Sequence, residues 1–69
     1  MKNKIKVNKK MVERFLDIMD DYGEFVFGDY DYLKEQLEIC LNNQGYWSGM
    51  SIRVYYNENT KDFAVASRF

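Results

Sequence analysis

The sequence contains no histidine and a single cysteine, and these two scarcities exclude much of the chemistry that a small protein can carry. Without histidine the chain lacks the usual general base, the commonest zinc ligand and the Ser-His and Cys-His nucleophile pairs. Cys40 by itself can form neither an intramolecular disulfide nor a zinc site of the Cys/His kind. Its place on the apolar side of a predicted helix favours a buried core residue. We therefore expect a non-enzymatic protein with no metal and no cofactor.

The chain also lacks a long apolar run and a phosphate-binding loop. No segment approaches the ~18 to 20 consecutive apolar residues that span a bilayer. The basic stretch 1–10 is followed by no apolar run, so we do not read it as a signal peptide. The four glycines form neither a Gly-x-Gly-x-x-Gly nor a Walker pattern. With only one thiol, the chain is typical of a reducing compartment, and we expect a soluble, cytoplasmic protein.

Aromatic side chains are abundant, and the charges are sorted along the chain. Of the 69 residues, 46% are hydrophobic and 17% are aromatic, which favours a single domain, 1–69, with its own core. The net charge of −1 conceals an asymmetry. Residues 1–14 hold six basic residues and one acidic residue, whereas residues 15–48 hold eight acidic residues and one basic residue.

The apolar periodicity predicts a mixed fold. Residues 3–7 alternate lysine with apolar residues, which indicates a short strand. Two helices follow, one capped by Asn8 and ended by Gly23, the other capped by Asp29 and running to about Asn43. Alternation over 50–56 and 63–69, around a polar loop 57–62, predicts a hairpin. The predicted fold class is α+β: a small antiparallel sheet, made of the N-terminal strand and the C-terminal hairpin, with two helices packed on one face in the order β-α-α-β-β.

The same patterns predict which side chains are buried. The predicted arc of the first helix is Val12, Phe15, Leu16, Met19 and Tyr22, with Met11 and Ile18 at its margin, and that of the second is Leu33, Leu37, Cys40 and Leu41. Met50 is predicted to share the inner face of the hairpin with Ile52. Small residues at 64, 66 and 67 indicate that something packs closely over the last strand. Residues 25–27 fit either a short strand or a buried connector, and we favour a connector with some extended character.

Acidic residues recur at helical spacing on the side of each predicted helix that faces away from its apolar arc. The first set is Glu13, Asp17, Asp20 and Asp21, with Glu24 just beyond the helix end, and the second is Asp31, Glu35 and Glu38. Residues three and four apart are neighbours on a helix, so each set forms a row of like charges that costs ~0.2–0.5 kcal/mol per pair. A solvated helix surface remains one interpretation. The other is a recognition surface, because surfaces made only for solubility interleave both signs.

We predict a small inhibitor whose acidic helical surface docks on the basic, nucleic-acid-binding surface of a larger protein. Its most specific form is a nucleic-acid mimic of the phage anti-defence, anti-CRISPR-like kind, by physical character alone. Trp47 and Tyr55 are predicted to be exposed and to join the interface. One alternative is a nucleic-acid-binding module that uses the lysine-rich N-terminus and the hairpin aromatics. Another is a small structural homodimer.

Overall fold

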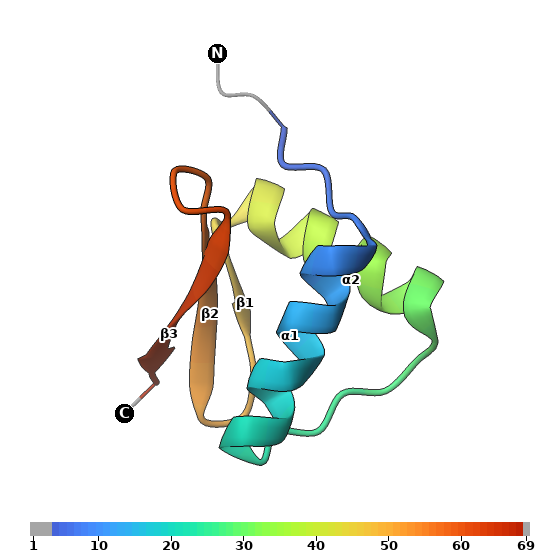
Figure 1. Cartoon of the computed structure of the whole chain (residues 1–69). Coiled ribbons are helices and arrows are strands. Elements are labelled where there is room, and N and C mark those ends of the chain that lie inside the picture. Colours follow the sequence, from blue (N-terminus) through green and yellow to red (C-terminus); the bar gives the residue numbers. More distant parts are fainter. Residues whose placement is uncertain (1–3, 69) are drawn as a thin grey trace.

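The protein, described here over residues 4–68 of a computed structural model, consists of two helices followed by a three-stranded sheet (Figure 1). The elements are α1 (Lys9–Tyr22), α2 (Tyr30–Asn43), β1 (Tyr46–Ser48), β2 (Ile52–Asn57) and β3 (Asp62–Ser67). The mixed α+β class is confirmed. The predicted order β-α-α-β-β is wrong, because the order is α-α-β-β-β. Residues 3 and 69, at the ends of two predicted strands, and Lys2 of the basic N-terminus lie outside the described residues.

The N-terminal segment 4–8 forms no strand, because its backbone is held by side chains of α2 instead of by a neighbouring strand. The Asn42 amide accepts from the Ile5 N–H at 2.8 Å and donates to the Ile5 carbonyl at 2.9 Å. The Glu38 carboxylate accepts from the Val7 N–H at 2.9 Å. Val7 is only 3% exposed, while Lys4 and Lys6 are exposed. The alternation therefore predicted the buried side of this segment correctly but not its pairing.

Both helices begin and end as the sequence predicts. The Asn8 side chain accepts from the Met11 N–H at 2.9 Å, and the Asp29 side chain accepts from the Tyr32 N–H at 2.9 Å, so each satisfies a free donor of the first turn. Gly23 ends α1 with φ of 67°, a left-handed conformation that glycine adopts without a steric penalty. Its N–H and that of Glu24 bond back to carbonyls of the last turn, which is the Schellman arrangement.

The buried arc of α1 is rotated from its predicted position. Leu16 and Tyr22 are 38% and 54% exposed, whereas Met11 and Ile18 are buried, with 8% and 3% of their surface exposed. The arc is centred on Phe15, whose ring meets that of Trp47 edge-on with centroids 4.9 Å apart. Apolar residues lie on both sides of Phe15 around the helix, so the periodicity alone did not determine which of them are buried.

The sheet is an antiparallel meander in the order β1-β2-β3, with both helices on one side of it (Figure 1). Trp47, Val54 and Val65 face one another across the three strands. On this inner face α1 packs against β3 and α2 packs against β1. The buried core consists of Val7, Met11, Val12, Phe15, Ile18, Met19, Leu33, Leu37, Leu41, Ile52, Val54 and Phe63.

The outer face of the sheet and the turn before β2 differ from the predictions. Met50 is 73% exposed, because it lies in the β1–β2 turn and not in a strand. Ala64 and Ala66 are exposed, so no part of the chain over residues 4–68 covers the outer side of β3. The segment 23–29 is an irregular connector, as favoured, but its predicted burial is wrong: Val26 packs against the core, while Phe25 and Phe27 are exposed. Neither described helix is long and apolar enough to cross a membrane.

Candidate functional site

Six of the predicted carboxylates lie exposed on the two helices. We call them the acidic surface: Glu13, Asp17, Asp20 and Asp21 of α1, and Asp31 and Glu35 of α2. None of the six lies within 4.0 Å of a basic group in residues 4–68, where the ion pairs are Arg14–Asp62 and Lys34–Glu38. The spacing therefore identified a row of carboxylates that the described part of the fold leaves without ion-pair partners.

Glu24 and Glu38, the other two predicted members, hold the fold together. The Glu24 carboxylate accepts from the Met50 N–H at 2.6 Å and from the Ser51 hydroxyl at 2.9 Å, so it ties the end of α1 to the β1–β2 turn. Glu38 accepts from the Val7 N–H, as described above, and lies 4.0 Å from the Lys34 ammonium. Both side chains are half-buried. Their bonds within the fold account for a carboxylate at each position, so neither residue requires a binding partner to explain it.

Arg14 lies beside the acidic surface but its guanidinium is bonded to β3. Its Nε donates to Asp62 Oδ1 at 2.9 Å. This hydrogen bond, with a second from the Phe63 N–H, lowers the pKa of the Asp62 carboxyl below its usual value. The same contact raises the pKa of Arg14, and Asp17 and Asp21 reinforce it at longer range. Arg14 therefore reduces the negative potential only at one margin of the surface.

The two aromatic residues predicted to be exposed lie on opposite sides of the sheet. Trp47 is half-buried on the inner face against Phe15. Tyr55 is half-buried on the outer face beside Tyr46, with ring centroids 5.5 Å apart, and the Arg53 guanidinium lies 4.9 Å above the Tyr46 ring. Trp47 and Tyr55 therefore cannot belong to one continuous contact with the helices.

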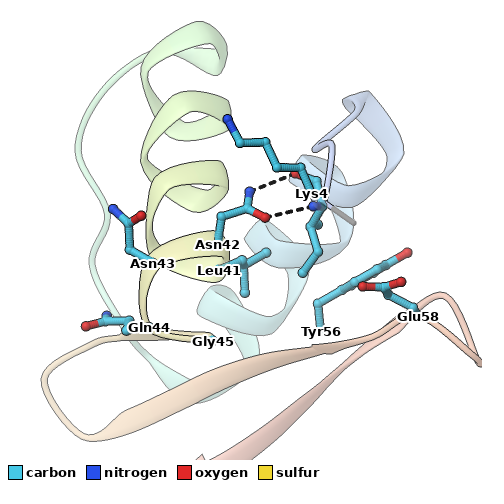
Figure 2. Close-up of a pocket in the computed structure, with 9 residues that line it drawn as sticks. Lys4, Leu41, Asn42, Asn43, Gln44, Gly45, Tyr56 and Glu58 are labelled. Carbon is cyan, nitrogen blue, oxygen red and sulfur yellow. Dashed lines mark hydrogen bonds between the residues drawn. The ribbon is translucent and has the colours of Figure 1, made fainter. Parts of the chain in front are cut away.

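A second region, which we call the basic hollow, surrounds Tyr56. Three adjoining depressions of about 680, 480 and 220 Å³ share this tyrosine in their lining. Their lysines are Lys4, Lys6, Lys10 and Lys61. Figure 2 shows the largest depression, with Tyr56 and Glu58 on the side opposite Asn43 and Gln44, and with the Asn42 amide bonded to the N-terminal segment. Because Glu58 and Asp62 are the acidic residues of this lining, and Asp62 is paired with Arg14, the hollow is net basic.

The remaining chemistry of the described residues is sparse. No group of three His, Cys, Asp or Glu side chains within residues 4–68 gathers in a way that could hold a metal ion. Cys40 is half-buried, less completely than predicted, and desolvation raises the pKa of its thiol. A raised pKa keeps the thiol protonated and slow to react.

Two features were missed by sequence reasoning. The basic hollow needs Lys61, which lies about 50 residues from the N-terminal lysines and meets them only through the fold. The exposure of Phe25 and Phe27 had a signal, because strict alternation in an extended connector turns only the central valine inward. Comparison of the chain with protein-family models, with curated proteins and with solved structures gave no match.

Proposed function

We propose that the protein is a small, non-enzymatic binding protein that docks its acidic surface on a basic surface of a larger protein. The observation that supports this most directly is that all six carboxylates are exposed and none has an ion-pair partner among residues 4–68. Unneutralised charge of one sign steers association with an oppositely charged partner and disfavours other partners. The association would be fast and would weaken as salt is raised.

The more specific proposal is inhibition of a nucleic-acid-processing protein in the cytoplasm, as in phage anti-defence or anti-CRISPR-like inhibitors. Along each helix the carboxylates follow one another about 5–6 Å apart, a spacing comparable with that of phosphates along a strand. Figure 1 shows α1 and α2 crossing, so the two sets do not form parallel rows. A mimic of this shape would meet a basic groove with α1 alone or with α1 and the start of α2.

Charge reversal at one carboxylate of each helix tests this function. We expect Asp17→Lys with Glu35→Lys to abolish capture of a basic protein from nuclease-treated lysate, with wild-type capture decreasing as salt is raised. The control is Glu58→Lys, because Glu58 is an exposed carboxylate of the β2–β3 loop outside the acidic surface. Each single reversal changes the net charge equally, so Asp17→Lys alone is compared directly with Glu58→Lys. Undiminished capture by the double variant would exclude the acidic surface as the contact.

A second candidate function, nucleic-acid binding, is favoured by the basic hollow. Lysines around an aromatic ring suit phosphate contact and base stacking on single strands. We expect Lys4→Glu with Lys61→Glu to remove binding of a fluorescent single-stranded oligonucleotide if this function is correct, and Asp17→Lys to leave that binding intact. An oligonucleotide that does not bind wild-type protein at low salt would dismiss the second candidate and leave the first standing.

A further inference from the structure

The connector between the two helices carries the most exposed large apolar side chains among those described. Phe25 and Phe27 are 76% and 80% exposed. Together with Val26 they border a groove of about 250 Å³, whose other walls are Tyr32, Leu33 and Gln36 of α2 and Trp47 of β1. Single exposed apolar residues are ordinary on protein surfaces, whereas two exposed phenylalanines beside an aromatic groove form an apolar patch of the kind that is found at interaction sites.

The exposure is imposed by a connector that is held at both ends. At its start, the Schellman turn at Gly23 is followed by Glu24, whose carboxylate bonds to the β1–β2 turn. In its middle, Val26 packs against the core. At its end, Asp29 caps α2. Because the backbone is fixed at these points, alternation directs both phenylalanine rings outward, where they are preorganised for a partner.

The charges beside the groove specify the occupant. Within residues 20–35, Lys34 is basic and the other charged residues are acidic: Asp20, Asp21, Glu24, Asp29, Asp31 and Glu35. The nearest cation along the chain, Lys34, lies beside Glu38. Glu35 lies three residues from Tyr32, so a member of the acidic surface adjoins the groove wall on α2. The groove is smaller than the ~300–1,000 Å³ usual for small-molecule sites and is better suited to one large side chain.

We propose that this groove receives an apolar side chain, best an aromatic one, from a basic segment of the partner, whose lysines or arginines meet the adjoining carboxylates. This inference rests on the proposed function, because it takes the partner to be basic. It adds the anchor that the acidic surface lacks: long-range charge gives rate and selectivity, whereas a buried aromatic contact supplies most of the affinity at a typical interface. The predicted anchor residues on this chain are Phe25, Phe27 and Tyr32.

Three synthetic peptides test the inference on the ¹⁵N-labelled full chain. The first is lysine-rich with one central tryptophan, the second replaces the tryptophan with alanine, and the third places the tryptophan among glutamates. We expect the lysine–tryptophan peptide to shift the amide resonances of residues 25–28 and Gln36 together with those of the acidic surface. The lysine–alanine peptide should shift the acidic surface alone and bind about tenfold more weakly, and the glutamate–tryptophan peptide should shift neither.

Two variants with matched exposure locate the anchor. Phe27→Ser should reduce the affinity for the lysine–tryptophan peptide to that of the lysine–alanine peptide. Met50→Ser is the control, since Met50 is 73% exposed and does not border the groove. Circular dichroism melting verifies that both variants fold.

The outcomes separate this inference from the proposed function. Equal binding of both lysine peptides at the acidic surface, unaffected by Phe27→Ser, would overturn the groove and support the proposed function. Groove shifts that survive high salt and Asp17→Lys, and that the glutamate–tryptophan peptide also produces, would overturn the basic occupant and weaken the proposed function. Absence of groove shifts with the lysine–tryptophan peptide would overturn the inference outright.

Discussion

Replacing Asn42 with alanine should detach the N-terminal segment from α2. The Asn42 side chain makes two bonds to Ile5, at 2.8 and 2.9 Å, and its amide nitrogen also donates to the Glu38 carbonyl at 2.8 Å. Each bond contributes a net ~0.5–1.5 kcal/mol, and the exposed position places these bonds toward the lower end. The loss of both bonds to Ile5 therefore costs about 1–2 kcal/mol. For a domain of this size that corresponds to a decrease in melting temperature of about 5–15 °C.

The neighbouring Asn43 provides a matched control. It is exposed at the end of α2, and no hydrogen bond of its side chain is found among residues 4–68. Both substitutions replace asparagine with alanine in the last turn of α2, which gains up to ~0.7 kcal/mol of helix propensity. The difference between the two variants therefore reports the bonds of the Asn42 side chain, two to Ile5 and one to the Glu38 carbonyl. The assays are urea denaturation for the free energy of unfolding and hydrogen exchange for the amides of Ile5 and Val7.

Hydrogen exchange should localise the effect. In Asn42→Ala the Ile5 amide loses its acceptor and should exchange quickly, and the Val7 amide should follow because its bond to Glu38 depends on the same segment. Val7, which is nearly fully buried, would then lose part of its contact with the core. If Asn42→Ala and Asn43→Ala melt within about 2 °C of each other and both amides keep their protection, the side-chain bonds do not hold this segment.

Three further outcomes follow from local geometry. Arg14 lowers the pKa of Asp62 in the folded state. The stability that this pair contributes is therefore present above about pH 4, the ordinary pKa of the unfolded carboxyl, and is lost as the pH falls through the lower pKa of the folded state. Arg14→Gln should therefore raise the Asp62 pKa measured by NMR, and the stability difference from wild type should disappear in acid. Gly23→Ala should decrease the free energy of unfolding, measured in urea, by about 1 kcal/mol, because a residue with a Cβ is strained at a φ of 67°. No atom lies within 4 Å of the added Cβ, so the cost comes from the backbone conformation and not from a steric contact. Cys40 should react with a thiol reagent more slowly in the native protein than in urea at pH 8, and equal rates would contradict its partial burial.

The helix boundaries were predictable because their signals are local. Asn8 and Asp29 cap the first turns through bonds to residues only three positions away, and Gly23 ends α1 through its own backbone conformation. The N-terminal strand failed because alternation reports which side chains are buried and not which group bonds the backbone. There the partners are Asn42 and Glu38, more than 30 residues distant.

Local sequence signals could not predict the strand β1 or the structural roles of two acidic residues. Tyr46–Ser48 spans three residues, too few to display a period of two, and its register with β2 is set by the folded sheet. Glu24 and Glu38 fit the acidic spacing as well as the true surface residues do. Only their partners, 26 to 31 residues away, distinguish them as structural. Regular spacing therefore predicts exposure of a helix face but not which members have bonds elsewhere.

The charges at the two ends of α1 are arranged unfavourably for the helix dipole. Exchanging them tests whether the acidic surface is a recognition surface or only a solvated one. The first turn of α1 holds Lys9 and Lys10 and no acidic residue, and its last turn holds Asp20 and Asp21 and no basic residue. A helix favours the opposite arrangement by ~0.3–1 kcal/mol per charge. Exchanging one charge at each end, as Lys10→Glu with Asp20→Lys, leaves the net charge unchanged and should stabilise the fold by about 0.6–2 kcal/mol in urea denaturation. If the same variant loses its protein partner, the carboxylates at the end of α1 are retained for binding at a cost in stability. A variant that is more stable and binds equally well would leave those carboxylates as a solvated helix end, and recognition would then depend on the groove beside the connector.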